Sequence, residues 1–101
     1  MSDELNIFRP YAAVNDLPFV REFDDGRVSF WSAESTGIDN DTDICIGEYY
    51  ARIAIAMAHR IDAPEIIALV FRDMVLGGKI GAIEAGFIGI VASAARAGSL
   101  N

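Results

Sequence analysis

The chain has 101 residues, a formal net charge of −7 and a hydrophobic fraction of 52%. This length allows one compact domain and excludes two domains of ordinary size. Residues 1–48 hold eleven acidic and three basic residues, whereas residues 49–101 hold four acidic and five basic ones. Because a phosphate backbone is repelled by the first half and finds no basic cluster in the second, we expect no direct binding of nucleic acid.

The single cysteine and the first residues indicate the cellular setting. Cys45 is alone, which excludes an intramolecular disulfide. The first residues lack the positive start and the apolar run of a signal peptide, so we expect a reducing, cytoplasmic setting. The most apolar stretch, 80–95, contains Glu84 and many glycine and alanine residues. It falls short of the roughly 20 strongly apolar residues of a membrane span, and we expect none.

A β-hairpin is predicted in the N-terminal third of the chain. Residues 17–23 and 27–32 flank the turn sequence Asp24-Asp25-Gly26. Asp-Gly favours the positive φ that a tight hairpin turn needs, and apolar and polar residues alternate after the turn. Residues 5–8 are compatible with a third short strand.

The aromatic side chains of this hairpin allow two interpretations. We favour packing of one hairpin face on the helices, because an isolated two-stranded hairpin is marginally stable. The alternative is that Trp31, with Phe30, projects as the anchor of a protein interface. An exposed hairpin edge could also pair with a strand of another chain.

An acidic loop precedes the first predicted helix. Asp39, Asp41 and Asp43 occupy positions one, three and five of a calcium-binding loop, but Ile44 and Tyr50 replace its required glycine and glutamate. Helix capping explains the same aspartates, so we expect no metal site. The two aspartates of the hairpin turn and the three of this loop make up the predicted acidic surface: Asp24, Asp25, Asp39, Asp41 and Asp43.

Apolar residues at helical spacing predict three helices, at about 43–61, 63–76 and 79–97. The start of the second is marked by Asp62, Pro64 and Glu65, which predict an N-cap, a first-turn proline and a capping box. Gly77-Gly78 predicts its end. The tight connections require consecutive helices to pack as neighbours.

The third predicted helix carries small residues at four-residue spacing. Glycine in a helix costs up to roughly 1 kcal/mol relative to alanine, so we expect close approach of another backbone as compensation. A helix of the same chain is the favoured neighbour, and a homo-oligomer or another protein is the alternative. A second, shorter row is formed by Ala82 and Gly86. The main row is Gly81, Ala85, Gly89, Ser93 and Ala97. The candidate interface residues are Trp31, Phe30, Gly81, Ala85, Gly89 and Ser93.

Few residues indicate chemistry. Cys45 and His59 lie about 21 Å apart along one helix, so they form no nucleophile–base pair, and we expect Cys45 in the core and His59 at the surface. Glu84 is expected to face water. A buried Glu84 should instead pair with Arg52, Arg60, Arg72 or Lys79. We predict no catalytic residue and no cofactor.

Together these patterns predict a single α+β domain, with an N-terminal antiparallel hairpin packed on a C-terminal three-helix unit. The leading functional hypothesis is a non-enzymatic protein-interaction module (an adaptor, regulator or inhibitor) that associates with itself. The second is an acidic phage or mobile-element inhibitor that blocks a basic, nucleic-acid-binding surface of a partner. The third is a small enzyme or ligand-binding domain that uses Glu84, Arg52 or His59 in a pocket.

Overall fold

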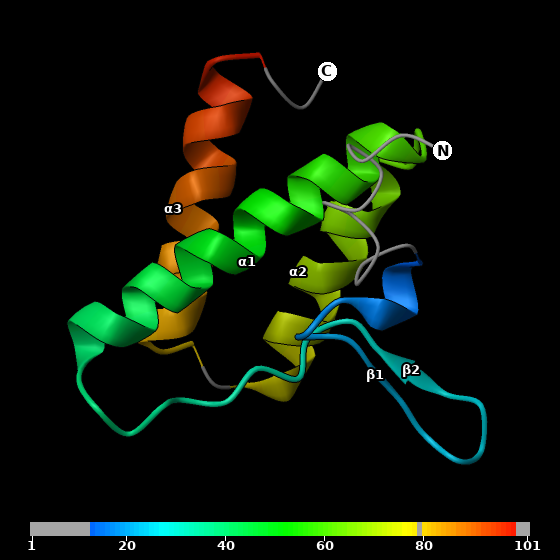
Figure 1. Cartoon of the computed structure of the whole chain (residues 1–101), viewed down its shortest axis with the longest axis horizontal. Helices are drawn as coiled ribbons and strands as arrows, with labels where there is room; N and C mark the ends of the chain where they lie inside the picture. The colour runs from blue at the N-terminus through cyan, green and yellow to red at the C-terminus, as the bar shows by residue number, and fades with distance from the viewer. Residues whose placement is uncertain (1–12, 79, 99–101) are drawn as a thin grey trace, which may run out of the picture.

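The computed structural model describes residues 13–78 and 80–98. A two-stranded antiparallel hairpin is followed by three helices, which confirms the α+β fold class (Figure 1). The strand considered at residues 5–8 lies outside the described residues. In chain order the elements are η2 (Val14–Asp16), β1 (Arg21–Glu22), β2 (Val28–Ser29), α1 (Asn40–Arg60), α2 (Glu65–Gly77) and α3 (Ala82–Arg96).

The hairpin is shorter than the sequence predicted. β1 and β2 pair in antiparallel register, with Arg21 opposite Ser29. The predicted Asp-Gly turn is confirmed, since Gly26 has a φ of 88°. Each strand has only two residues, so regular pairing contributes little to the position of this region.

The chain before the hairpin turns inward instead of extending the sheet. The Val20 amide donates to the Leu17 carbonyl at 3.0 Å, which closes a turn, and the Ser32 amide donates to the Phe19 carbonyl at 2.7 Å. This turn places Leu17 and Phe19 in the core, where they are 2% and 0% exposed.

α1 begins at Asn40, three residues before its predicted start. Asp39 is the N-cap, and its carboxylate accepts a hydrogen bond from the Thr42 amide at 2.7 Å. This bond lowers the pKa of Asp39 below its usual value of 3.8. A charged carboxylate at this position also matches the positive end of the helix dipole.

The predicted capping box at the start of α2 is wrong. Asp62 has a left-handed φ of 53°, and its amide donates to the His59 carbonyl at 3.3 Å, so it belongs to the turn that ends α1. α2 begins at Glu65 after Pro64, which provides no side-chain cap. The predicted end is confirmed, because Gly78 has the left-handed conformation that commonly follows a helix.

α1 packs mainly against α3, and the two backbones touch where they cross (Figure 1). A Cβ atom at Gly47 would overlap the Ile83 carbonyl oxygen, and one at Gly86 would overlap the Ile44 carbonyl oxygen. A side chain at either glycine would therefore push the helices apart. The close approach favoured from the sequence does occur within the chain, but it uses the second small row and not the Gly81–Ala97 row.

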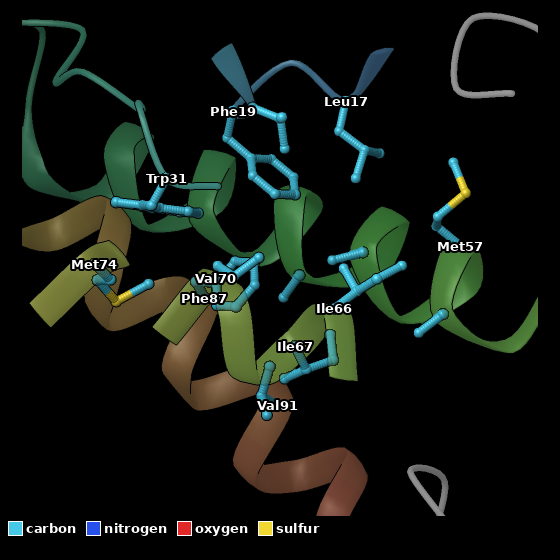
Figure 2. Close-up of a cluster of buried hydrophobic side chains, with 14 of the residues drawn as sticks. Leu17, Phe19, Trp31, Met57, Ile66, Ile67, Val70, Met74, Phe87 and Val91 are labelled. Atoms are coloured by element: carbon cyan, nitrogen blue, oxygen red, sulfur yellow. The ribbon is translucent and has the colours of Figure 1, made fainter. Parts of the chain in front are cut away.

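The core lies between α1 and the two later helices, and the N-terminal segment covers it (Figure 2). The ring centroids of Phe19 and Phe87 lie 5.9 Å apart, and those of Trp31 and Phe87 lie 4.9 Å apart in an edge-to-face arrangement. Such pairs contribute about 0.5–1.5 kcal/mol beyond their buried area. Among residues 13–78 and 80–98, no helix has the length and apolarity needed to cross a bilayer.

Candidate functional site

The hairpin is attached to α2 through Asp73. One carboxylate oxygen, Oδ2, accepts a hydrogen bond from the Phe30 amide at 2.7 Å, and Oδ1 accepts one from Arg72 Nε at 2.9 Å. The bond from Arg72 has the largest effect on the pKa of Asp73, burial opposes it, and the Phe30 amide adds to it, so the pKa falls below 3.8. Asp73 is therefore charged at neutral pH and fixes the end of the hairpin.

Glu84 is buried and does not face water, contrary to our prediction. It is 7% exposed, its Oε2 accepts a hydrogen bond from Trp31 Nε1 at 2.8 Å, and its Oε1 accepts one from the Gly81 amide at 2.7 Å. An indole and the N-cap amide of α3 thus replace the arginine or lysine expected for a buried glutamate. The carboxylate is accommodated because both oxygens have donors and the helix N-terminus favours negative charge.

Trp31 is part of the core, as the favoured interpretation of the hairpin predicted. It is 9% exposed, which leaves little of the indole for another protein to contact. Phe30 is half-buried and packs against the same core. These two members of the candidate interface therefore stabilise this chain itself.

Asp43 is also buried and does not contribute to an acidic surface. It is 5% exposed and accepts hydrogen bonds from Ser35 Oγ at 2.6 Å, Thr36 Oγ1 at 2.7 Å and the Thr36 amide at 3.0 Å. The bond from Ser35 is the largest cause, followed by those from Thr36, of a pKa below 3.8. Asp43 thus anchors the loop before α1 to the helix.

The other four aspartates of the predicted acidic surface are exposed, but they lie in two places. Asp24 and Asp25 are in the hairpin turn, and Asp39 and Asp41 are at the start of α1, on the other side of the molecule (Figure 1). Arg27 pairs with Asp25 at 2.7 Å. Within the described residues, no three His, Cys, Asp or Glu side chains are grouped so that they could hold a metal ion.

The main small row of α3 lies on the outer face of that helix. Its four candidate interface residues are exposed, and Ile88, at 38% exposed, lies beside them. The space around Gly89 is open, since no neighbouring atom lies within 4 Å of where its Cβ would be. From Ala85 to Ala95 the sequence has no charged residue. We call this surface the outer face of α3: Gly81, Ala85, Ile88, Gly89, Ala92 and Ser93.

A cavity of about 420 Å³ lies between the end of α1, the first half of α2 and the middle of α3. Its walls are mainly apolar, and His59 and Asp62 provide the polar lining. We call it the interhelical cavity: Ala58, His59, Asp62, Pro64, Ile67, Ala68, Phe71 and Val91.

The three residues of the enzyme hypothesis do not converge. His59 is exposed and lines the interhelical cavity, whereas Glu84 lines a different cavity, beside the start of α3. Arg52 is exposed on α1. Cys45 is exposed as well, which contradicts the predicted core position, because the inward face of this part of α1 is taken by Gly47.

A further exposed apolar region surrounds the connection between α2 and α3. Val75, Leu76 and Ile80 are 69%, 76% and 56% exposed. Nearby, the guanidinium groups of Arg21 and Arg27 lie 5.1 and 5.3 Å from the ring centroid of Phe23. This region has three exposed large aliphatic side chains, whereas the outer face of α3 has one, Ile88.

Comparison of the chain with protein-family models, with curated proteins and with solved structures finds no match.

Proposed function

We propose that this chain is a small protein-interaction module that associates with a second copy of itself through the outer face of α3. The observation that carries the proposal is that this face is exposed and uncharged. A surface helix normally directs charged and polar side chains to water. Here the face consists of Gly, Ala, Ser and one Ile, and part of α3 extends beyond α1 (Figure 1).

Gly89 strengthens the case for contact with another molecule. Glycine within a helix costs about 0.8–1 kcal/mol relative to alanine. At Gly86 the contact with α1 accounts for the missing side chain, but at Gly89 nothing in the described chain occupies the space. A backbone that approaches from another molecule would use that space, as small residues allow where helices cross.

Charge repulsion does not prevent a second copy from docking on this face. With a net charge of −7, two copies repel each other over most orientations. Two copies that meet through the outer face of α3 bring no like charges together on that face. A two-fold dimer uses the same surface patch on both chains, and a row of small residues is complementary in shape to itself.

Neither alternative has comparable support. An acidic inhibitor needs a continuous negative surface, whereas the four exposed aspartates of the predicted acidic surface are divided between the hairpin turn and the start of α1. An enzyme needs groups that converge on one cavity, whereas His59 and Glu84 line different cavities. The self-associating module therefore remains the proposal that the geometry supports best.

Sedimentation equilibrium of the full chain over a series of concentrations tests the proposal. We expect the mass to rise from monomer to dimer, and Gly89→Arg to abolish this rise by placing a charge in the contact. Gly77→Arg is the matched control, because Gly77 is also a helical glycine with open space around it and lies outside the outer face of α3.

The control should dimerise like the wild type. A wild-type chain that stays monomeric at all concentrations would contradict the proposal. So would a dimer that Gly89→Arg and Gly77→Arg affect equally. Circular dichroism of each variant establishes that the helices are intact before the masses are compared.

A further inference from the structure

The interhelical cavity lies between the end of α1, the first half of α2 and the middle of α3, and the α2 and α3 ribbons diverge from the end at which they are connected (Figure 1). α3 is held close to α1 near Gly47 and Gly86, at the other end of the crossing. The wedge between α2 and α3 is closed at one end by Phe71 and Phe87, whose ring centroids lie 5.8 Å apart. Beyond this pair, toward Val91, the wedge is open.

Two of the residues that line the wedge have small side chains. They are Ala58 and Ala68, whose methyl groups occupy little of the space. The volume of about 420 Å³ falls within the range of roughly 300–1,000 Å³ typical of ligand pockets. A cavity of roughly 150 Å³ holds one benzene molecule, so the space suits a ligand with one or two rings.

The polar groups of the cavity indicate the charge of such a ligand. Within residues 13–78 and 80–98, the side chains of His59 and Asp62 make no hydrogen bond or ion pair. A carboxylate and an imidazole can both accept hydrogen bonds from an ammonium group. Asp62 is the only carboxylate among the lining residues, and the lining contains no lysine or arginine. The net charge of −7 adds long-range attraction for cations.

We propose that the interhelical cavity binds a small apolar molecule that carries an amine, with the apolar part between Ile67, Phe71 and Val91 and the ammonium group at Asp62. This inference is independent of the proposed self-association. The test uses the Gly89→Arg variant, which is expected to stay monomeric. Self-association then cannot change the NMR signals that report on ligand binding.

The experiment is a titration followed by amide chemical shifts in two-dimensional NMR. The probes share one ring system: 1-naphthylmethylamine, 1-naphthylmethanol and 1-naphthylacetate. We expect the amine to bind with a Kd of about 1 mM or lower, within the usual efficiency of small ligands. Shifts should be confined to the cavity lining, with binding at least about fivefold weaker for the alcohol and weaker still for the anion.

Two variants separate the charge from the cavity. Asp62→Asn keeps a residue that tolerates the left-handed φ. This variant should weaken binding of the amine at least about fivefold but leave binding of the alcohol unchanged. Ala68→Leu should fill the cavity and weaken binding of both probes. Ala95 is an exposed alanine on α3 outside the lining, so Ala95→Leu should leave binding of both probes unchanged. Equal binding of the amine and the anion, or a response to Ala95→Leu like that to Ala68→Leu, overturns the proposal.

Discussion

The helical region, residues 40–98, and the N-terminal region, residues 13–38, are held in place by different kinds of contact. In the helical region, α1 and α3 meet through backbone atoms at Gly47 and Gly86, with apolar side chains around them. The N-terminal region has very little regular secondary structure. Three buried or half-buried carboxylates attach it to the helices: Asp43, Asp73 and Glu84.

This difference shows what each kind of contact can specify. Burial of apolar side chains stabilises the folded state but is not directional. The helices obtain their geometry from their own backbone hydrogen bonds. An irregular segment has no such regular series of backbone hydrogen bonds. Its position is instead set by side-chain acceptors that each receive a donor at 2.6–3.0 Å. The same chain thus uses shape in one region and directional polar contacts in the other.

The largest effect is expected where the helices touch. Gly86→Ala should lower the free energy of unfolding by about 3 kcal/mol or more, because the new Cβ meets backbone that cannot move independently. Gly89→Ala, on the same helix, should raise it by about 0.5–1 kcal/mol, since the space is open and alanine is the better helix former. Urea unfolding of both variants measures the difference. The same sign for both would refute the glycine contact.

The next largest effect is expected at the buried pair of Trp31 and Glu84. Glu84→Gln should lower the free energy of unfolding by about 1–3 kcal/mol, because one amide oxygen cannot replace two carboxylate oxygens that each accept a hydrogen bond. Trp31→Phe leaves one of these oxygens without its donor and should cost a similar amount or more.

A double-mutant cycle isolates the bond between the two side chains. We expect the double variant to be more stable than the sum of the single effects implies. Purely additive costs would mean that the indole and the carboxylate stabilise the fold separately.

A smaller effect should appear in acid. The pKa values of Asp43 and Asp73 are lower in the fold than the usual 3.8. For such groups the stabilisation is complete above the unfolded value and is lost as the pH falls through the folded one. We therefore expect the free energy of unfolding to fall below about pH 4.

The variant Asp43→Asn,Asp73→Asn provides the comparison for this pH dependence. It should be less stable at neutral pH and should lose less stability between pH 5 and about pH 2. Denaturant unfolding at several pH values checks this. A slope as steep as that of the wild type would show that other groups control the acid response.

The smallest effect is expected at the hairpin turn. Arg27 pairs with Asp25, but their side chains are 76% and 57% exposed, and exposed pairs contribute little. Arg27→Ala should change the free energy of unfolding by less than about 0.5 kcal/mol. A cost comparable to that of Glu84→Gln would mean that the turn itself, and not its attachment to α2 and α3, positions the N-terminal region.

The sequence predicted the features that local rules determine. The Asp-Gly turn, the three helices and the end of α2 at Gly78 all follow from patterns a few residues long. The failed capping box at Asp62 shows the limit of such patterns. The motif was present, but the residue belongs to the turn after α1, where its left-handed φ is incompatible with an N-cap.

The roles of Asp73 and Glu84 were missed because their partners are determined by the tertiary fold. Trp31 lies 53 positions from Glu84, and Phe30 lies 43 positions from Asp73. One local signal was available: Glu84 is three residues after Gly81, the spacing at which a helix glutamate reaches back to the N-cap amide.

The contact of α3 with α1 could also have been found. Both rows of small residues on α3 have the same spacing. The sequence of α3 by itself therefore does not indicate which row faces α1. α1, however, carries its own set of small residues at Gly47, Ala51, Ala54 and Ala58, all of them buried. A matched small face on a second helix predicts a contact within the chain.

The 53-residue separation between Trp31 and Glu84 also affects the order of events during synthesis. Chains grow at about 5–20 residues per second, so roughly 3–10 s pass between the appearance of the tryptophan and that of its acceptor. During this interval the aromatic side chains of the N-terminal region lack the α3 residues on which they pack. A nascent chain of this protein therefore exposes an apolar segment that chaperones can bind until Glu84 and Phe87 have been made.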